Sequence, residues 1–200
     1  MTERIGYDSI KRVAAAHTGS PARSAQTSVD MQPKQATPTK TMPKMPQPAV
    51  SVGTLVSPSR IIIIKGTPEK DEAMQSLVRV LCAANPELKP AEITERVRAR
   101  EQGISTTLDT GLSIPHCRLE GINNFLVAMA IIPEGMEDKA SPGLKIRVMF
   151  LFLSPSNPQF FQKHLQLLSS LSALFQPAFI DTLAACSTPE QAAAEITARK

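Results

Sequence analysis

The sequence is poor in aromatic residues and has no long apolar run. Only 4% of its 200 residues are aromatic, with no Trp and one Tyr, which disfavours a nucleic-acid binder that works by stacking bases. No apolar run approaches the roughly 20 residues of a membrane-spanning helix, and the N-terminus lacks the apolar segment of a signal peptide. We therefore expect a cytoplasmic protein that neither binds nucleic acid nor inserts directly into a membrane.

Cysteine is also scarce, and its placement disfavours two kinds of cross-linked fold. Cys82, Cys117 and Cys186 are odd in number and widely spaced, with no C-x-x-C pair. This usage disfavours a disulfide framework and a structural zinc site, and it favours a reducing compartment. The sequence has no P-loop motif either, so we expect no metal ion and no other cofactor.

The positive charge is concentrated in the N-terminal part of the chain. Residues 1–60 hold 8 Lys and Arg against 3 Asp and Glu, whereas residues 61–200 hold 14 against 15. Residues 18–59 are rich in Pro, Ser, Thr and Gln, and such a segment buries too little apolar area to offset its chain entropy. We predict a disordered, basic extension over residues 1–54 and a single domain over residues 55–200.

The second part of the chain alternates between strand and helix patterns. Apolar runs at residues 61–64, 124–132 and 145–153 are typical of buried strands. Prolines mark the expected helix starts, which are Thr67-Pro68, Pro90, Pro158, Pro177 and Pro189. In the helix expected after Pro158, the apolar face predicted from helical spacing consists of Phe161, Leu165, Leu168, Leu171 and Leu174. This alternation predicts an α/β domain.

Three histidines are present, and His116 has the most informative surroundings. It follows Ile114-Pro115, and proline fixes its own φ and pushes the preceding residue into an extended conformation. The chain therefore presents His116 stiffly at the end of a short strand. Imidazole is a good nucleophile that titrates near neutral pH, so His116 is a candidate reactive group. A loop histidine satisfied by a neighbouring carbonyl is the alternative that these residues leave open.

The other two histidines carry weaker signals. His164 borders the apolar face of its expected helix, so it is either a core histidine with one satisfying hydrogen bond or a partner of His116. His17 lies in the predicted extension, where we expect no role for it.

Arginines and hydroxyl residues near His116 in the sequence are candidates for binding phosphate. Arg100 and Arg118 offer the planar, permanently charged fork that suits phosphoryl oxygens. Ser105 and Thr106 can donate hydroxyl or backbone hydrogen bonds to the same oxygens, although ordinary turn chemistry explains them equally well.

The order of these residues resembles a known family. Arg100-Glu101, then Ser105-Thr106, then Gly111-Leu-Ser-Ile-Pro-His116 are similar to the RE, ST and G-x-A-I-P-H motifs of phosphotransferase-system enzyme IIA domains of the mannitol/fructose class, which includes the nitrogen-regulatory enzyme IIA. Phe150-Leu-Phe-Leu-Ser-Pro155 followed by His164-Leu-Gln-Leu-Leu168 resembles that family's strand and its H-L-x-x-L helix. The resemblance covers about residues 55–198.

The resemblance implies a fold and a reaction. The fold is a mixed β-sheet of about five strands flanked by helices. The resemblance further implies that the protein accepts a phosphoryl group from an HPr-like phosphocarrier protein on His116 and passes it to an enzyme IIB component. By the same resemblance, His164 is expected to hydrogen-bond near the phosphoryl group without carrying it, Arg100 to neutralise its charge, and Thr106 to line the site.

Two further functions stay open. In the first, the protein is a nitrogen-regulatory type of enzyme IIA, whose phosphorylation state controls partner proteins without sugar transport. In the second, it is a degenerate domain without transfer, which the joint presence of His116, His164 and Arg100 disfavours.

Overall fold

The computed structural model describes residues 50–103 and 105–199. The predicted extension up to residue 49, with His17, lies outside the described residues. Within them the chain forms, in order, α1 (Val52–Leu55), the 3-10 turn η1 (Pro58–Arg60), β1 (Ile61–Ile63), α2 (Lys70–Ala83), α3 (Pro90–Gly103), β2 (Leu112–Ser113), β3 (His116–Leu119), β4 (Leu126–Glu137), β5 (Lys145–Pro155), the 3-10 turn η2 (Pro158–Phe160), α4 (Phe161–Leu174), α5 (Pro177–Ala184) and α6 (Pro189–Ala198).

The five strands form one mixed sheet, which confirms the predicted fold class. Its order is β1-β4-β5-β2, and β3 also pairs with β5. The β4–β5 pair is antiparallel, whereas β1 runs parallel to β4, and β2 and β3 run parallel to β5. The sheet is therefore built on one long antiparallel pair, with short parallel strands along both of its edges.

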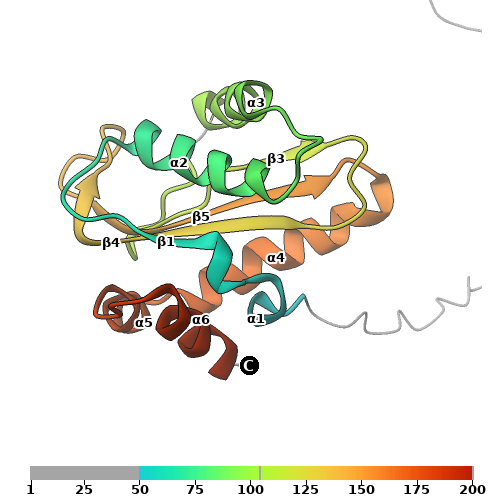
Figure 1. The fold of residues 1–200 in the computed structure, drawn as a ribbon. Helices are drawn as coiled ribbons and strands as arrows, with labels where there is room; N and C mark the ends of the chain where they lie inside the picture. Colours follow the sequence, from blue (N-terminus) through green and yellow to red (C-terminus); the bar gives the residue numbers. More distant parts are fainter. Residues whose placement is uncertain (1–49, 104, 200) are drawn as a thin grey trace, which may run out of the picture. The chain divides into compact units, whose positions relative to one another are not determined.

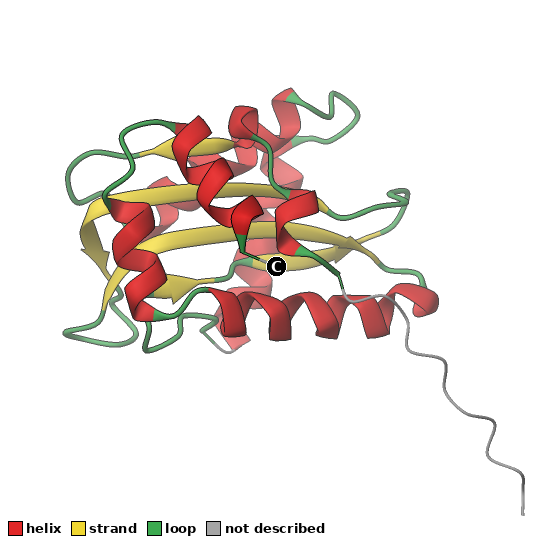
Figure 2. Cartoon of the chain, turned by 90° about the horizontal axis from the view of Figure 1, so that it is seen from below, coloured by secondary structure: helices red, strands yellow, loops and turns green. Residues whose placement is uncertain are grey.

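Helices cover both faces of this sheet (Figure 1). α2 and α3 lie on one face, and α1, α4, α5 and α6 lie on the other, where they stand in front of the strands in Figure 2. Each layer has its own buried apolar cluster against the sheet. The strands β4 and β5 are buried on both faces, because a nearly continuous apolar sequence suits a strand that is covered on two sides.

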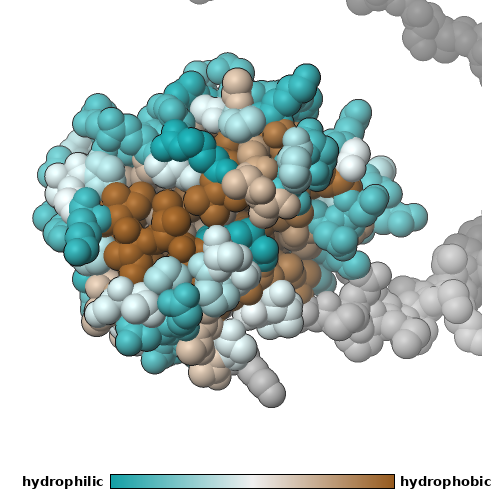
Figure 3. Space-filling model, viewed as in Figure 1, coloured by the Kyte–Doolittle hydropathy of each residue, from teal (hydrophilic) through white to brown (hydrophobic). Residues whose placement is uncertain are grey.

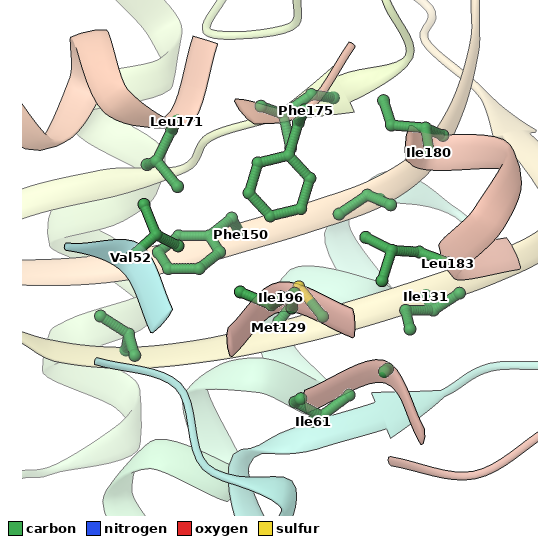
Figure 4. Packing of buried hydrophobic residues seen from close by; sticks show 14 of the residues in the cluster. Val52, Ile61, Met129, Ile131, Phe150, Leu171, Phe175, Ile180, Leu183 and Ile196 are labelled. Atoms are coloured by element: carbon green, nitrogen blue, oxygen red, sulfur yellow. The ribbon is translucent and has the colours of Figure 1, made fainter. Parts of the chain in front are cut away.

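The larger of the two clusters is built around phenylalanine (Figure 4). The rings of Phe150 on β5 and Phe175 at the end of α4 have centroids 6.0 Å apart, and Phe179 on α5 lies 5.7 Å beyond Phe175. Val52 on α1 is only 5% exposed and belongs to the same cluster. The domain core therefore includes a residue upstream of the predicted boundary at residue 55.

An apolar area is visible on one face beside β1, at the left of Figure 3. β1 is an edge strand, and its residues Ile62 and Ile63, together with the following Ile64, are only partly buried. β2 and β3 lie along the other edge of the sheet. These partly buried isoleucines therefore lie at the opposite edge of the sheet from the strand that carries His116.

Two predicted helix features were wrong in detail. α2 begins at Lys70 and not at Thr67-Pro68, because Glu69 and Glu72 form a reciprocal capping box two residues later. In α4 the buried residues are His164, Leu167 and Leu171, whereas Phe161 is 50% and Leu165 is 43% exposed. The predicted apolar face is thus rotated, and His164 points inward while two large apolar side chains face outward.

The structure also contains elements that the sequence patterns did not indicate. α1 and β3 are four residues each, too short for a periodicity to register. β4 continues from Ile132 to Glu137, with an irregular register between Ile131 and Met136, where Pro133 cannot donate to the ladder. Among the described residues no single helix is long and apolar enough to cross a membrane; the pair Pro158–Leu174 and Pro177–Ala184 passes that test only jointly, with a bend of 79°.

Candidate functional site

His116 is the first residue of β3, and its position follows from the way β2 and β3 pair in turn with β5. β2 pairs with Val148 and Met149 of β5, and β3 pairs with β5 again from Phe152 onward. Between the two strands, Pro115 has no N–H to donate, so the ladder is interrupted there. The chain resumes pairing at His116, which therefore begins a second strand and does not only follow the end of the first.

A main-chain carbonyl fixes the tautomer of His116. Its Nδ1 lies 2.8 Å from the carbonyl oxygen of Ile114. A carbonyl oxygen only accepts hydrogen bonds, so Nδ1 carries the proton and donates it. In the neutral ring, Nε2 then holds the lone pair and is the nucleophilic nitrogen.

Aromatic stacking fixes the plane of the same ring. His116 is stacked on Phe152, its register partner on β5, with 4.9 Å between the ring centroids and an interplanar angle of 4°. His116 is only 4% exposed. Carbonyl and phenyl ring together leave the imidazole little rotational freedom.

His164 reaches the same place from α4 and is 6% exposed. Its ring centroid is 5.2 Å from that of His116, with the rings inclined at 60°, and β3 and the start of α4 meet at one end of the sheet (Figure 1). Its Nδ1 lies 2.7 Å from the hydroxyl oxygen of Ser154. The structure thus brings together the two histidines that the sequence singled out.

Both imidazoles are held in the neutral state near pH 7. Burial lowers the pKa of His116 below 6.5, against the opposing effect of the Ile114 carbonyl, and the charge of Arg100 lowers it further. Burial also lowers the pKa of His164, to about 4, with further contributions from His116, Arg118 and Arg100. A neutral His116 keeps the Nε2 lone pair available for attack on phosphorus.

The two candidate arginines are placed differently. Arg100 is exposed in the last turn of α3, and its charge acts on both rings. The Arg118 guanidinium donates to the carbonyls of Ser156 at 2.8 Å and Asn157 at 3.2 Å. It also lies 5.7 Å from the ring centroid of Phe161. Arg118 therefore ties β3 to the loop that leads into α4, in addition to its electrostatic effect on His164.

The hydroxyl residues Ser105 and Thr106 belong to a segment between α3 and β2. The Thr106 hydroxyl donates to the carboxylate of Glu101, and the Thr106 carbonyl accepts from the N–H of Ile114 at 3.1 Å. The Ser105 hydroxyl donates to Asp138 at 3.4 Å. Thr106 is thus hydrogen-bonded to Ile114, two residues before His116. The Ser105 hydroxyl is directed to Asp138 instead.

Sequence reasoning missed several residues around the site. Ser154, which is fully buried beside His164, directly follows the apolar run at residues 148–153 of β5, and the sequence showed it only as part of the motif that ends at Pro155. Phe152 belongs to the same motif, which gave no indication that its ring stacks on His116. All three cysteines are free thiols, and burial raises the pKa of Cys117, next to His116, to about 11, so this thiol is inert at neutral pH. Among the described residues no group of three or more His, Cys, Asp or Glu side chains is arranged to hold a metal ion.

Comparisons with known proteins agree with this geometry. The family model described as "Phosphoenolpyruvate-dependent sugar phosphotransferase system, EIIA 2" matches residues 54–198. The nitrogen regulatory protein of Pseudomonas aeruginosa is 26% identical over 137 residues, which cover 68% of this chain and 88% of that protein.

Solved structures show the same likeness. The nitrogen regulatory protein IIA-Ntr of Neisseria meningitidis is 27% identical, with a TM-score of 0.64 and coverage of 73% of this chain and 99% of that one. Enzyme IIA-Mtl of Escherichia coli, solved in complex with phosphorylated enzyme IIB-Mtl, shares the fold at 19% identity, with a TM-score of 0.56 and coverage of 72% and 98%. With a family match over most of its length, the chain belongs to the EIIA 2 family of the phosphoenolpyruvate-dependent sugar phosphotransferase system.

Proposed function

We propose that this protein is a phosphoryl carrier whose Nε2 atom of His116 is transiently phosphorylated. The observation that carries the proposal is the hydrogen bond from Nδ1 to the Ile114 carbonyl. It leaves Nε2 as the nucleophile, and the stacked Phe152 ring holds the imidazole plane in place. The neutral partner His164 lies 5.2 Å away, centroid to centroid.

The proposed reaction is a transfer between two histidines. The lone pair of Nε2 attacks the phosphorus of a phosphohistidine on an HPr-like donor protein. The P–N bond of the donor breaks as the new P–Nε2 bond forms, and the electron pair of the broken bond stays on the donor nitrogen. The proton of His116 stays on Nδ1 throughout, donated to the Ile114 carbonyl. Because the transfer needs little covalent help, positioning and charge stabilisation supply most of the catalysis.

The surrounding residues have assigned roles in this proposal. Arg100 is exposed and close enough to act on both rings, so its guanidinium neutralises the phosphoryl oxygens. His164 donates from Nε2 when its Nδ1 accepts from the Ser154 hydroxyl, and it does not carry the phosphoryl group itself. Thr106 and Ser105 line the site beside the group, and Arg118 holds the start of α4 and adds positive charge.

The onward acceptor is an enzyme IIB component in the main version of the proposal. The solved complex of E. coli enzyme IIA-Mtl with phosphorylated enzyme IIB-Mtl supports an enzyme IIB as the kind of partner. We place the reaction in the cytoplasm, in keeping with the three free cysteines.

A regulatory version is supported by a different observation. The relatives from P. aeruginosa and N. meningitidis are both nitrogen regulatory proteins. In this version the phosphorylation state of His116 controls the binding of a target protein, and sugar transport is not served. The carrier chemistry at His116 is the same in both versions.

The test is labelling with radioactive phosphoenolpyruvate in the presence of enzyme I and HPr. The full-length protein is expected to gain an acid-labile, base-stable phosphate, and His116→Ala is expected to gain none. A label that persists in His116→Ala contradicts the assignment, as does an unlabelled wild-type protein that is folded. Chasing the label with enzyme IIB separates the two versions, because only the transport version predicts its rapid loss to that acceptor.

A further inference from the structure

A partly buried ionic cluster holds the segment between α3 and β2. Its centre is Lys70, the first residue of α2, whose Nζ lies 3.0 Å from the Thr107 hydroxyl and 3.2 Å from Oδ2 of Asp138. The same Nζ lies 3.4 Å from the carboxylate of Glu101 on α3. One ammonium group thus joins α2, α3, the turn after β4 and the segment that contains Thr107.

Asp138 is the most deeply buried member of this cluster. It is 2% exposed, and its carboxylate accepts from the Ala140 N–H at 3.0 Å, from Lys70 and from the Ser105 hydroxyl. Burial acts to raise the pKa of Asp138, but hydrogen bonds from Thr107, Ala140 and Lys70 outweigh it and leave the pKa below its usual value. Asp138 is therefore a charged, fully engaged anchor.

The cluster is connected to His116 through two further hydrogen bonds. The Thr106 carbonyl, between the anchored residues Ser105 and Thr107, accepts from the Ile114 N–H at 3.1 Å. The Ile114 carbonyl in turn accepts from Nδ1 of His116 at 2.8 Å. A shift of the segment from residue 105 to residue 107 is thus passed to the peptide that fixes the nucleophile.

We propose that Lys70 and Asp138 are positioning residues for phosphoryl transfer at His116. They hold Ser105, Thr106 and Thr107 in place, and so fix the backbone that orients the imidazole, without touching the phosphoryl group. This inference rests on the proposed function. Displacing reacting groups by about 1 Å costs up to about 100-fold in rate, so loss of either anchor lowers the rate of transfer more than the affinity for the donor protein.

The test compares three variants of the full-length protein with a matched control. Asp138→Asn keeps the shape and removes the charge, Lys70→Met removes the ammonium group, and Lys70→Arg keeps a cation. Lys139→Met is the control, because Lys139 neighbours Asp138 and pairs with Glu69, which precedes Lys70, but this pair is exposed on the surface. Initial rates of labelling are measured at varied HPr concentration, and circular dichroism checks that each variant is folded.

Asp138→Asn and Lys70→Met are expected to lower kcat by about 10-fold or more while KM for HPr changes by less than roughly two-fold. Lys70→Arg is expected to recover most of kcat, and Lys139→Met to behave as the wild type. Wild-type kcat in folded Asp138→Asn overturns the proposal, as does a change confined to KM. If Lys70→Met does not fold, Asp138→Asn and Lys70→Arg decide the outcome. An unlabelled wild-type protein contradicts the proposed function instead, so the two failures are distinguishable.

Discussion

The imidazole of His164 meets the imidazole of His116 at an interplanar angle of 60°, with 5.2 Å between the ring centroids. The Phe152 ring contacts both, stacked on His116 and tilted against His164 at 5.2 Å. Because the rings are buried together, a proton on one makes a proton on the other more costly. The pair is therefore suited to remain neutral and to receive a charged group from outside.

Replacing His164 with Ala is expected to slow the labelling of His116 by about 10- to 100-fold, the loss typical of one hydrogen bond to a charged group. The label itself is expected to remain on His116. Ser154→Ala, which frees Nδ1 of His164, should give a smaller effect of the same kind. Rapid-quench labelling measures both. Complete loss of label in folded His164→Ala would make His164 a direct participant.

The protonation of His116 should occur at a pH clearly below 6.5, since burial and the charge of Arg100 lower its pKa. Arg100→Gln is expected to raise this pKa. Arg98→Gln removes an equal charge from the same helix and serves as the control, because Arg98 is engaged with Asp71. Two-dimensional NMR titration of the ring nitrogens measures the pKa and also reports which nitrogen carries the proton. A proton on Nε2 at neutral pH would contradict the assigned tautomer.

The free energy of unfolding should decrease as pH falls from 6.5 toward 4. His164 has a pKa of about 4 in the folded protein and an ordinary value near 6.5 when unfolded. In this window the unfolded chain binds a proton that the folded protein does not, so acid favours unfolding. The lowered pKa of His116 acts in the same direction. Asp71 and Asp138 also have lowered pKa values, but the ordinary pKa of an aspartate, 3.8, places their effect at lower pH.

Urea unfolding at pH 7, 5.5 and 4.5 measures how the free energy of unfolding depends on pH. His164→Gln should make this free energy less dependent on pH, because the variant lacks the titrating imidazole of His164. A wild-type stability that is constant or increases over this range is incompatible with two depressed histidine pKa values.

A chain that begins at residue 50 should have nearly the same melting temperature as the full-length protein. A chain that begins at residue 55 should melt at a lower temperature, because it lacks the buried Val52, which packs in the core beside Phe150 and Leu171. Differential scanning calorimetry of the two truncations compares them directly. Equal melting temperatures would show that α1 adds nothing to stability, and the boundary predicted from the sequence would then be the right one.

Much of the fold was predictable because its signals are local. The two apolar runs that became β4 and β5, and the prolines that open α3, α5 and α6, needed no knowledge of distant contacts. β3 escaped notice because His-Cys-Arg-Leu has no strand pattern of its own, and only its pairing with β5 makes it a strand. The outward position of Leu165 was equally hidden, since its hydrophobicity favours a buried position.

The site residues also differ in whether the sequence alone could indicate them. His116 and His164 could be singled out from their motifs, and the structure brings them together. Lys70 and Asp138 could not, because the contacts of Lys70 with Thr107 and Asp138 join residues 37 and 68 positions apart. An isolated lysine at a helix start and an aspartate in a turn look like ordinary solvated residues until the fold places them in one cluster.

The hydrogen bond between His116 and Ile114 makes the tautomer of His116 insensitive to most substitutions at position 114. The group that sets the proton on the ring is a peptide oxygen, which every amino acid supplies. No single codon change at position 114 removes that acceptor, so the tautomer depends on the path of the main chain and not on the identity of a neighbouring side chain. Sequence drift around the nucleophile can therefore be tolerated as long as the Pro115 turn and its strand pairing persist.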